Sequence, residues 1–241
     1  MANFANYPQF LAEKDTFSIA SEFNNFTTGQ DGWTSLVVDG GTSVAVNDAA
    51  GGIATLTTAA TDNNEVMVRS TTALFLPVAG KPLFCRVRFT HTEANTDDVN
   101  LFIGFASSAG ANLLVDDGAG VRTSGSVFGI YKIDGGTVWR THSRNGSTAT
   151  DTVTQSSNNM TSGVYHELEL QIQDFSANQC VVTYLLDGVY LRDNTSYANV
   201  IADRVSYSSL VVMNFVACYC KAGGATSEVP LVDWALAAQV R

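Results

Sequence analysis

Apolar and polar residues alternate along residues 164–192, and this stretch is the clearest structural signal in the chain. One face of the extended segment carries His166, Leu168, Leu170 and Ile172, and the other carries Glu167, Glu169, Gln171 and Gln173. A period of two residues predicts a β-strand that belongs to a sheet with one wet face.

The residues that follow predict a β-hairpin. An apolar strand is expected over 180–186, and Asp187 and Gly188 come directly after it. Glycine tolerates a positive φ, so this dipeptide suits a tight turn between antiparallel strands. Residues 189–191 are then expected to pair back onto the strand before the turn.

The same patterns recur along the chain and predict an all-β protein. Further strands are expected at 33–38, 42–46, 53–57, 65–70, 83–90, 100–106, 127–133, 138–144, 211–219 and 231–240. The segments 100–106 and 211–219 are apolar on both faces, which predicts central strands. A total of about 12 strands is typical of two stacked antiparallel sheets. Residues 31–241 are therefore expected to form one sandwich domain.

Residues 1–30 are the unusual part, because they carry large apolar side chains without a strict period. Four of these are Phe4, Tyr7, Phe10 and Leu11. The segment is interpreted either as a lead-in that packs on the sandwich or as an arm that docks on a neighbouring subunit. Aromatic anchors spaced along a polar segment suit both interpretations.

Composition and charge exclude two classes of partner. The net charge of −10 repels a nucleic-acid backbone, so no nucleic-acid partner is expected. No apolar run reaches the roughly 18 residues of a membrane helix. The N-terminus lacks a basic start followed by an apolar run, so synthesis in a cytoplasm without a secretory signal is expected.

The cysteines do not indicate a metal site, and no cofactor is expected. Cys85, Cys180, Cys218 and Cys220 lack the paired spacing of a zinc site. Buried free thiols are expected, with a disulfide between Cys85 and Cys218 as the alternative. Oxygen-rich loops occur at 62–65, 97–98 and 116–118. Ordinary turn chemistry of Asp and Asn is expected there, with a structural Ca²⁺ as the alternative, although no DxDxDG-type calcium loop is present.

A family resemblance rests on motifs in a fixed order. These are FCRVRF, NLFIGFAS, SVFGIYKIDGGTVWRTHSRNG, HELELQIQ, CVVTYLLDGVYL and a closing VDW strand. Over about residues 30–241 the chain resembles the concanavalin A-like lectin/glucanase superfamily, which includes the laminin G-like domains. The resemblance implies a two-sheet antiparallel jelly-roll sandwich. It implies no single function, because this fold hosts lectins, hydrolases and structural proteins.

An enzymatic role is not predicted. Glucanases of this fold carry acidic residues on one strand as ExDxxE, and retaining hydrolysis needs two carboxyl groups about 5–5.5 Å apart. Only Glu167 and Glu169 share a strand face in this way, and their setting predicts a solvated sheet face. His91, His142 and His166 lie outside any GxSxG-type setting, and surface or strand-edge positions are expected for them. No catalytic residues are assigned.

A carbohydrate-binding site would need aromatic platforms and polar groups. Tyr131, Trp139, Arg140 and Arg144 cluster on one predicted hairpin. Alternation puts Trp139 on one face and both arginines on the other, which indicates a core tryptophan and surface arginines. Glycan binding by these four residues is the alternative.

The chain resembles virion proteins of tailed bacteriophages in three respects. These are its low charge, its composition rich in Thr, Ser, Ala and Gly, and its aromatic N-terminal segment. The resemblance implies a capsid decoration (cement) protein on the head surface, bound to the major capsid protein and to copies of itself. The second hypothesis is a lectin-like carbohydrate-binding module for attachment to a host surface, and the third is a glycan-active hydrolase.

Overall fold

A computed structural model describes residues 16–24, 28–29, 31–38, 42–46, 52–93, 98–146 and 152–240. These residues form strands and loops only, which confirms the predicted all-β fold class. Among them no helix is long and apolar enough to cross a membrane.

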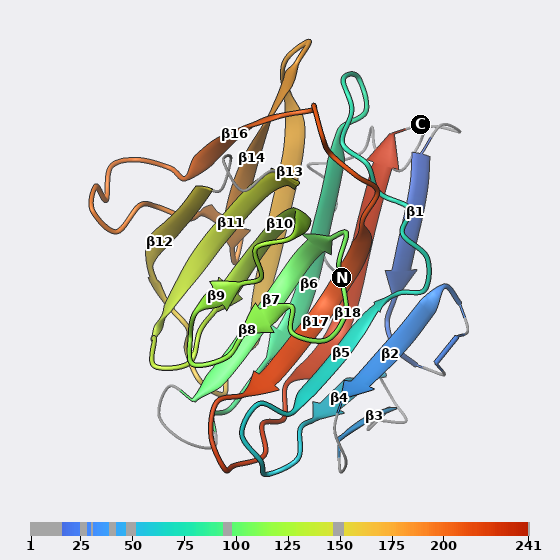
Figure 1. Ribbon diagram of the computed structural model, residues 1–241, viewed down its shortest axis with the longest axis vertical. Coiled ribbons are helices and arrows are strands. Elements are labelled where there is room, and N and C mark those ends of the chain that lie inside the picture. Colours follow the sequence, from blue (N-terminus) through green and yellow to red (C-terminus); the bar gives the residue numbers. More distant parts are fainter. Residues whose placement is uncertain are drawn as a thin grey trace.

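Two large antiparallel sheets stack as layers, with the seven-stranded sheet in front of the nine-stranded sheet in Figure 1. The seven-stranded sheet has the order β12 (Thr152–Asn159), β11 (Val138–Gly146), β10 (Gly125–Lys132), β7 (Val99–Ala106), β17 (Asn214–Ala222), β5 (Glu65–Ser70) and β2 (Trp33–Val38). The other sheet has the order β15 (Val189–Tyr190), β14 (Gln179–Leu186), β13 (His166–Ser176), β6 (Leu83–Thr90), β18 (Leu231–Val240), β4 (Ala54–Thr57) and β3 (Ser43–Val46). Two further strands complete it, since β1 (Thr16–Ser21) pairs with β18 and β16 (Ala202–Ser206) pairs with β14.

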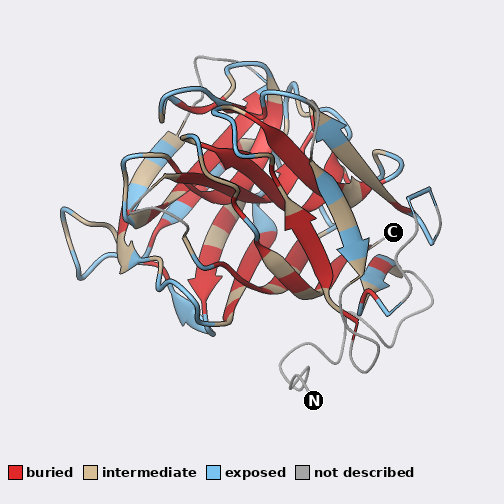
Figure 2. Cartoon of the chain, turned by 90° about the horizontal axis from the view of Figure 1, so that it is seen from below, coloured by how far each residue is buried: buried red, intermediate tan, exposed pale blue. Residues whose placement is uncertain are grey.

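The main hydrophobic core lies between the two sheets, where Figure 2 shows mostly buried strands. Every residue of β7 and β17 is buried, which confirms two central strands. β17 begins at Asn214, however, and Val211 and Val212 of the expected range 211–219 are exposed. In β6 the alternation is also as predicted. Cys85, Val87 and Phe89 belong to the core, while Arg86 and Arg88 on the opposite face are half-buried.

The hairpin between β14 and β15 has the turn that its sequence predicts. Asp187 and Gly188 have φ values of 52° and 78°. Positive φ at both central residues is the geometry of a two-residue hairpin turn. In addition, the Asp187 carboxylate accepts a hydrogen bond from the backbone N–H of Glu167 at 2.8 Å, which ties the turn to β13.

Five strands were not expected from the sequence: β1, β12, β16 and the short pair β8 (Leu114–Val115) and β9 (Gly120–Val121). β12 and β16 are polar and lie at or beside a sheet edge, where apolar alternation is weak. β1 falls within the predicted lead-in segment, and its pairing with β18 brings residues 16–21 into the sandwich. Phe23 follows it and packs against Trp33 with ring centroids 5.4 Å apart. The anchors Phe4, Tyr7, Phe10 and Leu11 lie outside the described residues.

All four cysteines are free and buried, as the sequence predicts. Cys218 and Cys220 both point into the core from β17, and Cys85 joins them there from the other sheet. Burial raises the pKa of the Cys180 thiol and of the Cys218 thiol to about 12. The pKa values of the other two thiols are also raised, mainly by burial.

Candidate functional site

The outer face of the seven-stranded sheet points away from the sandwich core and carries apolar and aromatic side chains together with polar ones. Residues that pair in neighbouring antiparallel strands lie on the same side of the sheet and form rows across it. One row runs through Leu36, Met67, Tyr219, Phe102, Tyr131, Arg140 and Gln155. The next row runs through Val38, Glu65, Lys221 and Asn100.

Part of this outer face is covered by the loop between β7 and β10, residues 107–124, which we name the cover loop. The loop contains β8 and β9, which lie in front of β7 and β10 in Figure 1. Its apolar side chains join those of the sheet in a second core cluster, outside the sandwich core. The cluster comprises Met67, Phe102, Ala106, Ala109, Leu113, Leu114, Val121, Val127, Tyr131, Ile133, Val216 and Tyr219. This part of the face is therefore closed to solvent.

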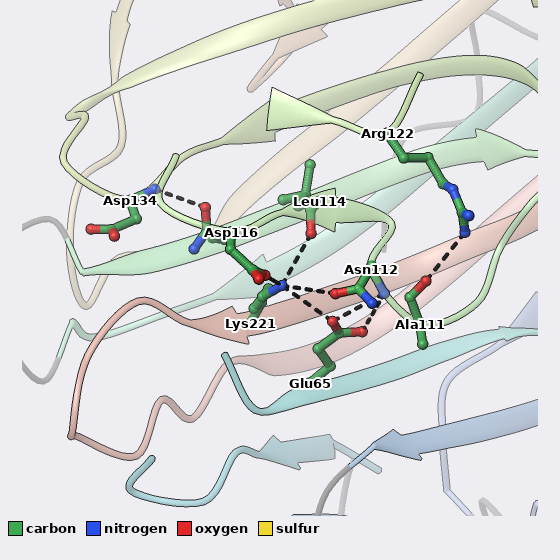
Figure 3. A network of polar contacts seen from close by, with 9 residues as sticks. Glu65, Ala111, Asn112, Leu114, Asp116, Arg122, Asp134 and Lys221 are labelled. Atoms are coloured by element: carbon green, nitrogen blue, oxygen red, sulfur yellow. Dashed lines mark hydrogen bonds and ion pairs between the residues drawn. The ribbon is translucent and has the colours of Figure 1, made fainter. Parts of the chain in front are cut away.

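A buried lysine holds one side of the cover loop (Figure 3). Lys221 Nζ lies 3.3 Å from Glu65 Oε1, and both side chains are almost fully buried. The same Nζ donates hydrogen bonds to Asn112 Oδ1 at 3.2 Å and to the Leu114 carbonyl at 3.3 Å, and it forms an ion pair with Asp116. Glu65 accepts from the Asn112 backbone N–H at 2.7 Å. Three residues of the loop are thus bonded to side chains on the outer face of the sheet.

Tyr219 lies beside this ion pair in the neighbouring row and is also fully buried. Burial, and then the negative charge of Glu65, raise the pKa of the Tyr219 hydroxyl well above its usual value. The phenol is therefore neutral over the physiological pH range. The closed part of the face combines a neutral phenol with an ion pair whose two charges offset each other.

A second buried cation holds the other side of the cover loop. Arg144 donates from Nη2 to the carbonyls of Arg122 at 2.6 Å and Ser124 at 2.9 Å, and from Nε to the carbonyl of Gly125 at 2.7 Å. Arg122 in turn donates to the Ala111 carbonyl at 3.2 Å, across the loop (Figure 3). Hydrogen bonds from a charged donor to buried carbonyls are among the stronger ones in proteins.

The outer face remains accessible at β11, β12 and residues 192–194. Arg140 pairs with Gln155, whose side chain is exposed. Asp193 forms a bridge with Ser156, and the Asn194 N–H donates to the Gln155 carbonyl at 3.0 Å. Because side chains alternate along extended chains, Asn194 lies on the same face as Gln155. Arg140, Gln155 and Asn194 therefore continue one row, which we name the open edge.

The four glycan-binding candidates of the predicted hairpin lie in different environments in the structure. Trp139 is fully buried in the sandwich core, where it packs edge-on against Phe89 with centroids 5.8 Å apart. Tyr131, Arg140 and Arg144 share the outer face, and for the two arginines a common face is what the alternation predicts. Tyr131 and Arg144, however, are buried at the cover loop, so the expected surface position of Arg144 is wrong. Only Arg140 is partly exposed.

The two glutamates considered for hydrolysis lie on the outer face of the other sheet. Arg86 forms ion pairs with both Glu167 and Glu169, and its Nε lies 3.6 Å from Glu169 Oε2. Gln171 also donates to Glu169, at 2.6 Å. The expected solvated face is wrong for Glu169, which is 4% exposed, because neighbouring strands supply partners that let a carboxylate be buried.

The expected surface positions of the three histidines are also wrong. His91, His142 and His166 are 2%, 2% and 7% exposed. His91 Nε2 lies 2.9 Å from a carboxylate oxygen of Glu228, and His166 Nδ1 lies 2.8 Å from one of Asp187. Acidic partners from distant segments explain the burial of His91 and His166, and the sequence alone does not reveal such partners.

The acidic loops were candidates for a metal ion, and the structure describes the surroundings of most of their carboxyl groups. No group of three or more His, Cys, Asp and Glu side chains that could hold a metal ion occurs among the described residues. Asp116 is paired with Lys221. Asp134 donates its backbone N–H to the Asn100 side chain at 2.9 Å, and partial burial, followed by repulsion from Asp98, raises the pKa of its carboxyl. Asp97 lies outside the described residues.

Sequence reasoning missed Glu65 and Lys221, although both had a signal. Glu65 ends the oxygen-rich segment DNNE and begins the strand expected at 65–70, and Lys221 closes the apolar segment VACYCK. A lysine in a doubly apolar central strand is buried only if it finds an acidic partner. Gln155 and Asn194 had no such signal, because they become neighbours only in the folded sheet.

Comparison of the sequence with protein-family models finds no match, and comparison with curated proteins finds none that is similar. Solved structures do match. Peanut lectin has a TM-score of 0.59 at 16% identity, over 93% of this chain and 97% of the lectin. The carbohydrate recognition domain of Emp47p has a TM-score of 0.56 at 8% identity, over 93% of this chain and 95% of that domain.

An endo-1,3-beta-glucanase from Streptomyces sioyaensis is similar to the same extent. Its TM-score is 0.58 at 10% identity, over 95% of this chain and 98% of the glucanase. At these identities the likeness concerns the fold alone. The chain has the two-sheet antiparallel jelly-roll fold of the concanavalin A-like lectins and glucanases.

Proposed function

We propose that this chain is a non-catalytic, lectin-like module that binds carbohydrate at the open edge. The observation that carries the proposal is the division of the outer face. The part under the cover loop is closed, whereas Arg140, Gln155 and Asn194 remain as an accessible row of hydrogen-bonding side chains. Binding sites for small molecules use a few convergent polar groups of this kind.

The closed part supports a non-catalytic role. Its carboxylates among the described residues, Glu65 and Asp116, are both paired with Lys221. A glycosidase places two carboxyl groups on either side of the scissile bond, with one of them free to donate a proton. Here the cover loop occupies the space above Glu65, and Lys221 engages both acids. Two of the similar structures are by name a lectin and a carbohydrate recognition domain, which further supports binding.

The test is a glycan array screened with fluorescently labelled protein, followed by calorimetric titration of the ligands found. We expect the double substitution Gln155→Ala with Asn194→Ala to weaken binding at least about tenfold, since each lost hydrogen bond contributes about 1 kcal/mol. Gln173→Ala, an exposed glutamine of the other sheet, is the matched control and should leave binding unchanged. The proposal fails if no glycan binds, or if the double variant binds as well as the wild type.

A second candidate is the virion role implied by the sequence. It is supported by the four large apolar residues of the segment before β1, in a chain whose described residues already enclose a sandwich core. Deleting residues 1–15 should then leave the melting curve near that of the full chain but abolish self-association or binding to a capsid lattice. A truncated chain that unfolds, from a full-length protein that is monomeric, would contradict this role.

A further inference from the structure

We propose that the open edge selects glycans that carry a carboxylate group, and that Arg140 is the residue that recognises the carboxylate. The inference rests on the proposed function and adds to it the chemical class of the ligand. Uronic and sialic acids are sugars of this class. Gln155 and Asn194 would contact the hydroxyl groups of the same ligand.

The state of Arg140 is the first argument. The other described arginines each have a hydrogen-bonding, ionic or aromatic partner, for example Asp233 for Arg88 and the ring of Phe175 for Arg204. Among the described residues, the Arg140 guanidinium has no hydrogen bond, ion pair or aromatic ring, and its Nε is shielded from solvent without an acceptor. The chain has a net charge of −10, yet no acidic side chain among the described residues neutralises Arg140. Its positive charge can therefore attract an anionic ligand to this face.

The geometry of the row is the second argument. Arg140 lies on β11, Gln155 on β12, and Asn194 on the segment that pairs with β12 at its outer side. Neighbouring strands lie about 4.8 Å apart, so the three side chains span about 10 Å in a line. A planar guanidinium at one end fits a carboxylate through two parallel hydrogen bonds. Side-chain amides both donate and accept, so they suit sugar hydroxyl groups.

The rigidity of the neighbouring segment is the third argument. Arg192 donates from Nη1 to the carbonyls of Tyr197 at 3.2 Å and Ala198 at 3.0 Å, and Asp193 accepts from the Thr195 N–H at 2.6 Å. Figure 1 shows the segment that leads into β16 projecting beyond β12. The side chain of Tyr197 on this segment is 67% exposed. These bonds hold the backbone that carries Asn194, and a preorganised backbone loses less entropy when a ligand binds.

The experiment compares three oligosaccharides of one backbone by calorimetric titration: a hexuronate oligomer, its carboxyl-reduced neutral form and a sulfated neutral form. We expect the wild type to bind the hexuronate at least about tenfold more tightly than the reduced form. Arg140→Gln should remove this preference, and Arg140→Lys should restore part of it, since lysine keeps the charge but not the planar fork. Arg204→Gln is the control and should retain the preference.

Each outcome decides between the proposals. Equal affinity for the hexuronate and the reduced form would overturn the carboxylate inference but leave the lectin-like function standing. A preference for the sulfated form that depends on Arg140 would also overturn it, and would assign sulfate as the recognised group. A preference for the hexuronate that survives Arg140→Gln would overturn the role of Arg140. Binding of no oligosaccharide here and of no glycan on the array would overturn both proposals.

Discussion

Lys221 and Glu65 lie opposite each other in the register of β17 and β5, and their charges meet 3.3 Å apart beneath the cover loop. The pair lies between the outer face of the sheet and the cover loop, in a second buried layer of the protein. Lys221 also bonds to the side chain of Asn112 and to the carbonyl of Leu114, so the ion pair both neutralises the floor and anchors the loop.

Lys221→Met should destabilise the protein by about 3–5 kcal/mol, because it leaves the buried Glu65 carboxylate without its cation. Adding Glu65→Gln should recover part of the loss, since a neutral amide oxygen can still accept from Asn112. Urea unfolding measures both variants. The control Arg88→Met removes a half-exposed pair with Asp233 and should cost at most about 1 kcal/mol. Equal losses of stability for Lys221→Met and Arg88→Met would contradict this prediction.

Arg144→Met should loosen the cover loop without unfolding the sandwich, because three carbonyls at residues 122, 124 and 125 lose their charged donor. Hydrogen exchange should become faster in residues 107–125 and stay slow in β6 and β13. Arg192→Met, which removes the donor to two carbonyls of another loop, should leave the cover loop protected. Unchanged exchange in the Arg144 variant would show that apolar packing and the contacts of Lys221 hold the loop without Arg144.

Asp203 should make stability depend on pH. Burial raises the pKa of this carboxyl, although it accepts hydrogen bonds from Tyr184 at 2.8 Å and Ser143 at 2.9 Å. Between the unfolded pKa of about 3.9 and the raised pKa of the folded state, the folded protein keeps a proton that the unfolded chain has released. The contribution of Asp203 to stability should therefore fall as pH rises from about 4 through the raised pKa. Asp203→Asn should lack this decline in urea unfolding measured between about pH 4 and 7.

The four thiols should be unreactive in the folded protein. Cys85, Cys180, Cys218 and Cys220 are buried and free, and burial raises the pKa of each. The thiolate is the reactive form, so burial and a high pKa both slow alkylation. Mass spectrometry after treatment at pH 8 should show no adducts on the native protein and four on the denatured protein without reductant. Only two adducts on the denatured chain would indicate a disulfide.

No hydrolysis of β-1,3-glucan or other glycans is expected. Glu167 and Glu169 are engaged by Arg86, and Glu65 is engaged by Lys221. Reducing-end assays on a polysaccharide panel check this. If turnover appears, the variants Glu65→Gln, Glu167→Gln and Glu169→Gln identify its source, and loss of turnover in any one of them would make the chain an enzyme.

Much of the fold follows from the sequence by itself. A period of two residues places Leu168 and Leu170 in the core and Glu167 and Glu169 on the opposite face, because successive side chains of a strand point to opposite sides. Asp187 and Gly188 specify the hairpin turn in the same local way. Strands β12 and β16 were not predicted in this way, because strands at or beside a sheet edge need no apolar alternation.

Only the tertiary structure decides which strands are neighbours and what covers their outer faces. Alternation puts Arg140 and Arg144 on one face of β11, but only the course of the cover loop buries Arg144 and leaves Arg140 partly exposed. Lys221 and Glu65 lie far apart in the chain and meet only through the pairing of β17 with β5. The periodicity of a strand specifies the side to which a residue points, and long-range pairing specifies the residues that it meets there.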